Sequence, residues 1–192
     1  MISRHGVEGT VPPHAVNHHA HIWVLRNMNV EGVVCFGSVG GLSENFTPGR
    51  LLLASDYYAP YRTVTFHTNS MATTIPRLMT PWREHVARWL NDAGVDFVKE
   101  GVYAETLGLR FETQAEVQAL ARVADVVGMT CASEATLARE VCLPVAILAM
   151  VDNVAHGLGV EPLTGDAFHA KVRENESAVV NALQAIRHGA SA

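Results

Sequence analysis

The sequence predicts a single-domain α/β fold over residues 1–192, with a mixed central sheet flanked by helices. Short apolar runs rich in valine and leucine alternate with longer segments that have helical periodicity and capping residues. Hydrophobic residues make up 48% of the chain and charged residues 17%, and no linker or low-complexity tract divides it. This composition suits one well-packed interior and excludes a disordered chain.

Charge and cysteine usage exclude several classes of protein. A net charge of -5 without a Lys/Arg-rich run argues against a nucleic-acid partner. The longest apolar run, VAILAMV, is stopped by Asp152 and Asn153 and is too short to span a membrane. The start of the chain has no apolar signal-peptide region, so we expect a soluble, cytoplasmic protein. Its cysteines are then expected to be reduced and buried: Cys35, Cys131 and Cys142.

The first half of the chain is expected to form two helices, two strands and a long loop. The helices cover residues 12–28, opened by Pro12 and Pro13, and 81–91, capped by Thr80. The apolar stripe of the first helix is expected at Val16, Ala20, Trp23 and Val24. The strands cover residues 30–36 and 51–54. The run 37–41 is expected to be a loop that lets a ligand approach the backbone, and 56–80 a long functional loop.

The second half is expected to alternate strands with helices. Strands are expected at residues 95–98, 102–104, 125–128 and 145–151, the last being an unbroken apolar run typical of a central parallel strand. Thr113 and Glu116 form a capping box for one helix, with Val117, Leu120 and Val123 on its inner face. Ser133 is the expected N-cap of a second helix, and a last helix covers residues 166–187.

Three polar residues follow strand-like runs or precede helices, which is where α/β folds place ligands: Glu112, Thr130 and Asn153. Glu112 has a second interpretation, because a carboxylate before a helix is favoured by the helix dipole alone. Arg4 and His5 can present several donors to one oxyanion, or can belong to a solvated terminus.

His14 and His18 lie one helical turn apart, with His21 close by. No HExxH motif and no carboxylate partner accompanies them, so we expect interface or pocket-rim histidines and no metal site.

Several motifs together resemble the trimeric purine nucleoside phosphorylase and methylthioadenosine phosphorylase family. They are RHG, VPPHAVNHHAHIWVLRN, GSVGGL, TPGRLLLASD, GVYAETLGLRFETQAE, DVVGMTCASEATLARE and AILAMVDN, in the family's order. The GLRFET element and the Asn that ends AMVDN resemble the branch acting on 6-oxopurine nucleosides, which includes methylthioinosine phosphorylases. The resemblance implies a homotrimeric pentosyltransferase that uses inorganic phosphate as co-substrate and needs no metal or organic cofactor.

The resemblance also implies residue roles. Phosphate contacts are implied for Arg4, His5 and Thr130, with Ser38 in the loop between phosphate and nucleoside. Nucleoside contacts are implied for Met129 on the ribose, Phe111 stacking on the purine, and Glu112 with Asn153 reading and stabilising the base.

Two departures from the family pattern affect the expected activity. Family members carry a strand, a Gly/Ser-rich phosphate loop and a further strand before the RHG motif, so we expect a family fold without those parts. Gly165 stands where nucleoside phosphorylases carry a histidine that contacts the 5′-hydroxyl, which suggests an apolar 5′ group or a relaxed 5′ site. The alternatives to phosphorolysis are a nucleosidase, a non-catalytic purine-binding homologue and an inactive fragment.

Overall fold

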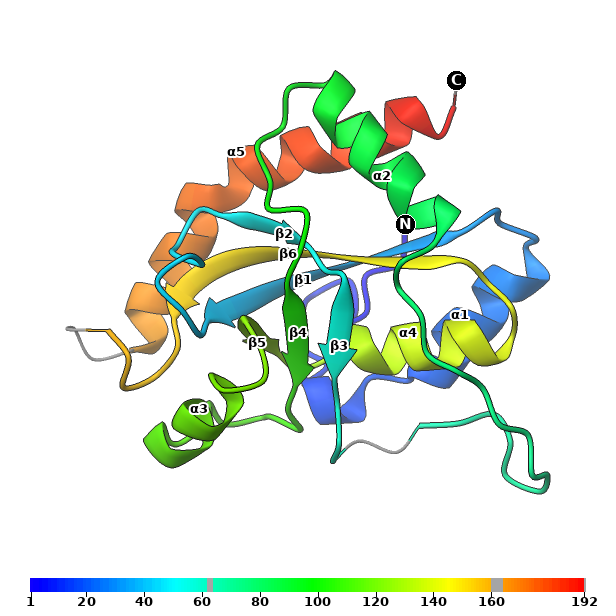
Figure 1. Ribbon diagram of the computed structural model, residues 1–192, viewed down its shortest axis with the longest axis horizontal. Helices are drawn as coiled ribbons and strands as arrows, with labels where there is room; N and C mark the ends of the chain where they lie inside the picture. The colour runs from blue at the N-terminus through cyan, green and yellow to red at the C-terminus, as the bar shows by residue number, and fades with distance from the viewer. Residues whose placement is uncertain (62–63, 160–163, 192) are drawn as a thin grey trace.

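A computed structural model describes residues 1–61, 64–159 and 164–191, and a six-stranded sheet forms its centre (Figure 1). The strands, in the order β2-β6-β1-β5-β4-β3, are β1 (Val33–Gly41), β2 (Leu51–Leu53), β3 (Asp56–Tyr58), β4 (Val102–Glu105), β5 (Val126–Gly128) and β6 (Val145–Val154). β1 pairs with β6, β3 with β4 and β4 with β5 in parallel, whereas β1–β5 and β2–β6 are antiparallel. The predicted mixed α/β sheet is confirmed.

Helices cover both faces of this sheet. They are α1 (His18–Asn27), α2 (Pro81–Asp92), α3 (Gln114–Leu120), α4 (Cys131–Glu140) and α5 (Gly165–Gly189). Figure 1 shows α2 and α5 on one face and α1 with α4 on the other. The alternation of side chains along β6 explains the two layers, because successive residues of a strand point to opposite faces. Ile147, Ala149 and Val151 join the core on the α1/α4 side, whereas Leu148 and Met150 join the core on the α2/α5 side.

The first helix begins later than the prolines suggested. Pro13–Ala15 form a single 3₁₀ turn, after which Val16 is extended and the Asn17 side chain caps α1 by accepting the Ala20 N–H at 3.0 Å. The expected apolar stripe was wrong, because Trp23 and Val24 are exposed and the buried residues of α1 are His18 and Ile22. The asparagine cap therefore sets where α1 begins, whereas packing against α4 selects the face that carries His18 and Ile22 for burial.

Other differences concern element type. Residues 37–41 are not a loop but the second half of β1, and a Cβ at Gly41 would collide with the Phe46 carbonyl oxygen. Residues 56–58 form β3, so the expected loop begins after it, and residues 95–98 make only one isolated bridge, between Val98 and Leu52. Ser133 is not an N-cap, because α4 already begins at Cys131.

Several local predictions are confirmed. The Thr80 hydroxyl caps α2, whose buried face includes Val86 and Leu90. The Thr113/Glu116 capping box starts α3, although Val123 lies beyond the end of that helix and is exposed. Cys35 and Cys131 are buried thiols, whereas Cys142 is exposed, contrary to expectation. Within residues 1–61, 64–159 and 164–191, every helix is too short or too polar to cross a bilayer.

Candidate active site

One cavity of about 670 Å³ gathers the side chains that the sequence analysis singled out. Its lining includes all eight: Arg4, His5, Ser38, Phe111, Glu112, Met129, Thr130 and Asn153. They come from the N-terminal segment, β1, the approach to α3, the β5–α4 turn and the end of β6. The volume is within the usual range for small-molecule sites, roughly 300–1,000 Å³. A larger hollow of about 950 Å³ between α2 and α5 contains none of these residues, so the smaller cavity is the candidate site.

The turn that carries Thr130 is held from behind by Tyr103 on β4. The Tyr103 hydroxyl accepts the backbone N–H groups of Thr130 and Cys131 at 3.3 and 3.2 Å. Burial raises the pKa of Tyr103, so this hydroxyl stays neutral. Glu105, also on β4, accepts the N–H and the hydroxyl of Ser133. The first N–H groups of α4 are thus satisfied by side chains of β4, and the Thr130 hydroxyl, which lies 3.9 Å from the Cys131 thiol, remains for a ligand.

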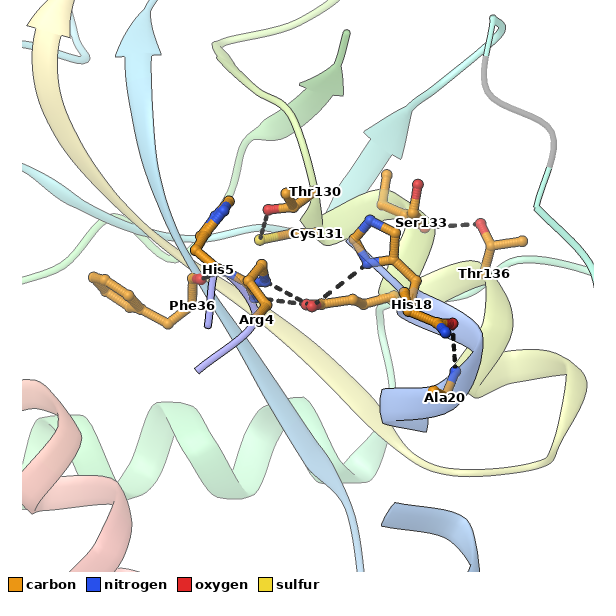
Figure 2. Close-up of polar contacts among 12 residues, drawn as sticks. Arg4, His5, His18, Ala20, Phe36, Thr130, Cys131, Ser133 and Thr136 are labelled. Atoms are coloured by element: carbon orange, nitrogen blue, oxygen red, sulfur yellow. Dashed lines mark hydrogen bonds and ion pairs between the residues drawn. The ribbon is translucent and has the colours of Figure 1, made fainter. Parts of the chain in front are cut away.

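Arg4 is fixed at the same end of the cavity by a buried carboxylate. Its Nε and Nη2 donate to the two oxygens of Glu134 at 2.6 Å each, and its Nη1 donates to the Phe36 carbonyl at 2.5 Å. Burial would raise the pKa of Glu134, but the neighbouring His18 and Arg4 lower it to about 2. Burial opposes the charge of Arg4 as well, yet the nearby Cys131 and Glu134 outweigh it and raise the pKa of Arg4. Both groups are therefore charged at neutral pH. Figure 2 shows Arg4, His5 and Thr130 gathered in one place.

His5 reaches the cavity with a defined tautomer. Its Nδ1 lies 2.8 Å from the Val11 carbonyl oxygen, which can only accept, so Nδ1 carries the proton. In the neutral ring Nε2 is then an acceptor, suited to a protonated oxygen of an anion such as hydrogen phosphate.

Glu112 also lines this cavity and is buried, with only 7% of its surface exposed. The Thr106 hydroxyl donates to its Oε1 at 2.5 Å and leaves Oε2 for a ligand. The capping box of α3 fixes the segment that carries it, because Glu116 accepts the Thr113 N–H at 2.7 Å and pairs with Arg110 at 2.8 Å. Glu112 also lines a second cavity of about 510 Å³ and separates it from the first.

A register shift between β1 and β6 orients Asn153. Val39 lies opposite Val151 but Gly40 lies opposite Asn153, so Asp152 is an extra residue in β6. Paired residues of parallel strands face the same side, so Asn153 shares the face of Gly40 and Ser38 instead of the face of Val151. An uninterrupted strand would point Asn153 into the core on the α1/α4 side.

Hydrogen bonds then fix the groups around Asn153. Its Nδ2 donates to the Val154 carbonyl at 2.9 Å, which identifies the amide nitrogen and leaves Oδ1 and one N–H for a ligand. Asp152 accepts from the Ser38 hydroxyl and from Asn175 Nδ2 of α5, the latter at 2.7 Å. Gly40 leaves room for this amide, because a Cβ there would lie 3.3 Å from Asn153 Nδ2 and would displace it by a few tenths of an ångström.

Aromatic rings and histidines close the cavity. Phe111 packs edge-on against Phe168 of α5, with ring centroids 5.8 Å apart, and Met129 lines the same space. His156 and His169 also line it. Sequence reasoning did not assign Phe168, His156 or His169, although His156 lies three residues after Asn153 and Phe168 begins the periodic stripe of the last helix.

The cysteines and histidines favour neither covalent nor metal chemistry in the part of the chain that the structure describes. Burial raises the pKa of Cys131 to about 11, so its thiol is a poor nucleophile. No group of three or more potential metal ligands occurs among residues 1–61, 64–159 and 164–191. His18 is buried, whereas His14 is exposed, so the two do not form a shared site.

The fold and the cavity define an α/β protein whose candidate ligand site lies where the central strands end. The model of the phosphorylase superfamily matches residues 1–187, and the chain belongs to that superfamily. The family and the enzyme class expected from the sequence are confirmed.

The chain is also similar to individual nucleoside phosphorylases over most of its length. The chain is 37% identical over 178 residues to a probable 6-oxopurine nucleoside phosphorylase of Archaeoglobus fulgidus, covering 91% of this chain and 72% of that protein. It is 31% identical over 188 residues to a probable S-methyl-5′-thioinosine phosphorylase of Methanocaldococcus jannaschii, covering 96% of this chain and 75% of that protein. A solved adenosine/methylthioadenosine phosphorylase of Schistosoma mansoni, in complex with adenine, superposes with a TM-score of 0.84 at 21% identity. That alignment covers 98% of this chain and 76% of the solved one, and it shows the shared fold.

Proposed function

We propose that the protein catalyses phosphorolysis of a 6-oxopurine ribonucleoside or its 5′-methylthio form. The products are the free purine base and ribose 1-phosphate or 5-methylthioribose 1-phosphate. The observation that carries this proposal is the single cavity shared by the anion-binding set and the base-reading pair. The names of the two relatives above, one acting on 6-oxopurine nucleosides and one on methylthioinosine, support the same substrate class.

In the proposed reaction a phosphate oxygen forms a bond to C1′ of the sugar while the bond from C1′ to N9 of the purine breaks. The transition state places positive charge on the sugar and negative charge on the departing base. Arg4 and the Thr130 hydroxyl donate to phosphate, and His5 accepts from its protonated oxygen. Ser38 lies between phosphate and nucleoside, and Met129 contacts the ribose. The bound anion also stabilises the cationic sugar.

The base is held by its oxygen-bearing edge. Phe111 stacks on the ring, and Glu112 Oε2 accepts the proton that N1 carries in a 6-oxopurine. Asn153 donates its remaining N–H to O6 and accepts at Oδ1 from a protonated N7, which stabilises the leaving group. One well-placed hydrogen bond of this type contributes roughly 3–4 kcal/mol at a transition state. The reaction needs neither a metal nor an organic cofactor.

Purine release, measured with and without phosphate, tests the proposal. The protein is incubated with inosine and with methylthioinosine, and hypoxanthine is quantified by chromatography. We expect release only when phosphate is present, and the ratio of the two values of kcat/KM identifies the preferred 5′ group. Release without phosphate would identify a nucleosidase, and absence of release under both conditions, with hypoxanthine still bound in calorimetry, would identify a non-catalytic purine-binding protein.

We also propose that the working form is a cytoplasmic homotrimer. Large apolar side chains lie exposed near the cavity mouth and along the loop before α2: Leu109, Phe111, Met71 and Ile75. A second copy covering such side chains would remove apolar surface from water. Light scattering gives the mass directly, and a monomer at micromolar concentration would contradict the trimer.

A further inference from the structure

Glu134, which lies within the DVVGMTCASEATLARE motif but has none of the proposed roles, is the main contact of Arg4. The carboxylate lies on the first turn of α4, and 6% of the residue is exposed. It binds Arg4 through two hydrogen bonds of 2.6 Å, the bidentate geometry in which a guanidinium and a carboxylate share one plane. The dashed lines between Arg4 and His18 in Figure 2 mark the contacts of this carboxylate.

The geometry leaves a defined part of Arg4 for a ligand. A guanidinium has five N–H donors, and three of Arg4's donate to Glu134 and to the Phe36 carbonyl within the described chain. One N–H on each Nη nitrogen remains, and the side chain lines the candidate site. An arginine side chain without such partners samples many rotamers, and holding it in one orientation before the anion binds lowers the cost of binding.

The far side of Glu134 is also constrained. The buried His18 places Nδ1 3.7 Å from Glu134 Oε1, too long for a hydrogen bond but close enough for electrostatic attraction. Neither ring nitrogen of His18 has a hydrogen-bond partner among the described residues. Thr130 is the N-cap of α4, and its carbonyl accepts the Glu134 N–H at 3.3 Å, so the first turn of the helix links the two residues. One helix turn therefore sets two parts of the anion site relative to each other.

We infer that Glu134 is a positioning residue of the phosphate site, acting through Arg4. This inference rests on the proposed function for its kinetic readout. The negative charge of Glu134 has the opposite effect on phosphate binding, because a carboxylate near the anion repels it and neutralises the charge of Arg4. Orientation outweighs charge here because the pair is buried and bidentate, so loss of the carboxylate releases the guanidinium from its plane. Small displacements of a positioned group can cost about 100-fold in rate.

The test compares Glu134→Gln with the unmodified protein. Glutamine has the same shape but no charge and binds a guanidinium through one oxygen. Positioning predicts that kcat/KM for phosphate falls at least about tenfold while KM for the nucleoside stays within about twofold. Charge neutralisation alone predicts the reverse, tighter phosphate binding. An unchanged or improved kcat/KM for phosphate would overturn the inference.

Two further variants keep the test decisive if Glu134→Gln folds poorly. Glu134→Asp preserves the charge but withdraws the carboxylate by one methylene, so positioning predicts a similar loss and a purely electrostatic role predicts none. Glu140→Gln is the matched control, because Glu140 lies on the same helix but has a different partner from Glu134. It accepts the Phe66 N–H in a hydrogen bond of 2.6 Å. It should leave kcat/KM for phosphate within about twofold, and an equal loss there would assign the effect to helix stability.

A double-mutant cycle with Arg4→Lys identifies the route of the effect. Lysine lacks the planar fork, so Glu134→Gln should change kcat/KM for phosphate by less than about twofold in that background. A full additional loss would show that Glu134 does not act through Arg4 and would overturn the inference.

Calorimetric titration with inorganic phosphate separates this inference from the proposed function. Weaker phosphate binding by Glu134→Gln supports positioning even if no nucleoside is cleaved, and no phosphate binding by the unmodified protein contradicts it.

Discussion

Replacing Asn153 with aspartate tests how the site distinguishes a 6-oxopurine from a 6-aminopurine. Asn153 Nδ2 already donates to the Val154 carbonyl at 2.9 Å, so one N–H and Oδ1 remain for the base. That N–H is the proposed donor to O6. Aspartate offers acceptors only, so O6 of inosine would lose its partner, whereas the 6-amino group of adenosine would gain an acceptor.

The expected change follows from the burial of the residue, which is 8% exposed. A buried polar atom left without its partner costs about 1–3 kcal/mol, and a hydrogen bond to a charged group contributes about 1.5–3 kcal/mol. Together these effects shift preference by an amount on the order of 3 kcal/mol, which is roughly 100-fold in the ratio of kcat/KM values.

The assay measures kcat/KM for inosine and for adenosine at saturating phosphate. Asn153→Ala serves as the control because it removes donor and acceptor together, so both substrates should lose activity with a smaller change in their ratio. Melting temperatures of the three proteins show whether folding is affected. If Asn153→Asp leaves the inosine-to-adenosine ratio unchanged, Asn153 does not read the base and the proposed orientation of the purine is wrong.

Three further predictions concern the surrounding contacts. Thr106→Val removes the 2.5 Å hydrogen bond to Glu112, so kcat/KM for inosine should fall about tenfold with KM for phosphate unchanged, and unaltered kinetics would refute this role. Gly40→Ala places a Cβ 3.3 Å from Asn153 Nδ2, so inosine cleavage should fall at least about tenfold, and full activity with a similar melting temperature would argue against this crowding. The lowered pKa of Glu134, about 2 against a usual 4.5, means that its ion pair stabilises the fold above about pH 5 and is lost as the pH falls toward 2. The melting temperature should therefore drop more steeply below pH 5 in the unmodified protein than in Glu134→Gln, and equal slopes would contradict the assignment.

Local signals predicted much of the fold because they depend on nearby residues. The capping box at Thr113 and Glu116 and the cap at Thr80 act within one helical turn, and both are present in the structure. The apolar run of β6 is central because both of its faces are covered, which requires apolar residues at every position.

Features that depend on tertiary contacts could not be predicted in this way. The start of α1 is set by Asn17 as its cap, whereas the prolines ahead of it suggested an earlier start. The start of α4 precedes Ser133 because Tyr103, which is 28 residues before Cys131, holds the first N–H groups. Residues 37–41 continue as a strand because β6 pairs with them, although glycine and serine favour a loop.

In the candidate site, too, local motifs predicted some features, whereas others depend on tertiary contacts. All eight motif residues line one cavity, but their supporting partners lie far away in sequence, such as Glu134 at 130 positions from Arg4. One signal was available, since Glu134 follows Thr130 by four residues and lies within the same motif. Without the Arg4 contact, that spacing does not distinguish a positioning group from a solvent-exposed glutamate.

The extra residue in β6 makes the specificity of this protein sensitive to strand length as well as to side-chain identity. Insertion of one residue between Val39 and Gly40 would give Asp152 a partner in β1, restore regular pairing and rotate Asn153 away from Ser38 to the face of Val151. The amide would then point into the apolar layer above α4, and the purine would lose its partner although the asparagine itself was retained. A relative that differs only in this spacing would thus possess the motif without the ability to recognise the base.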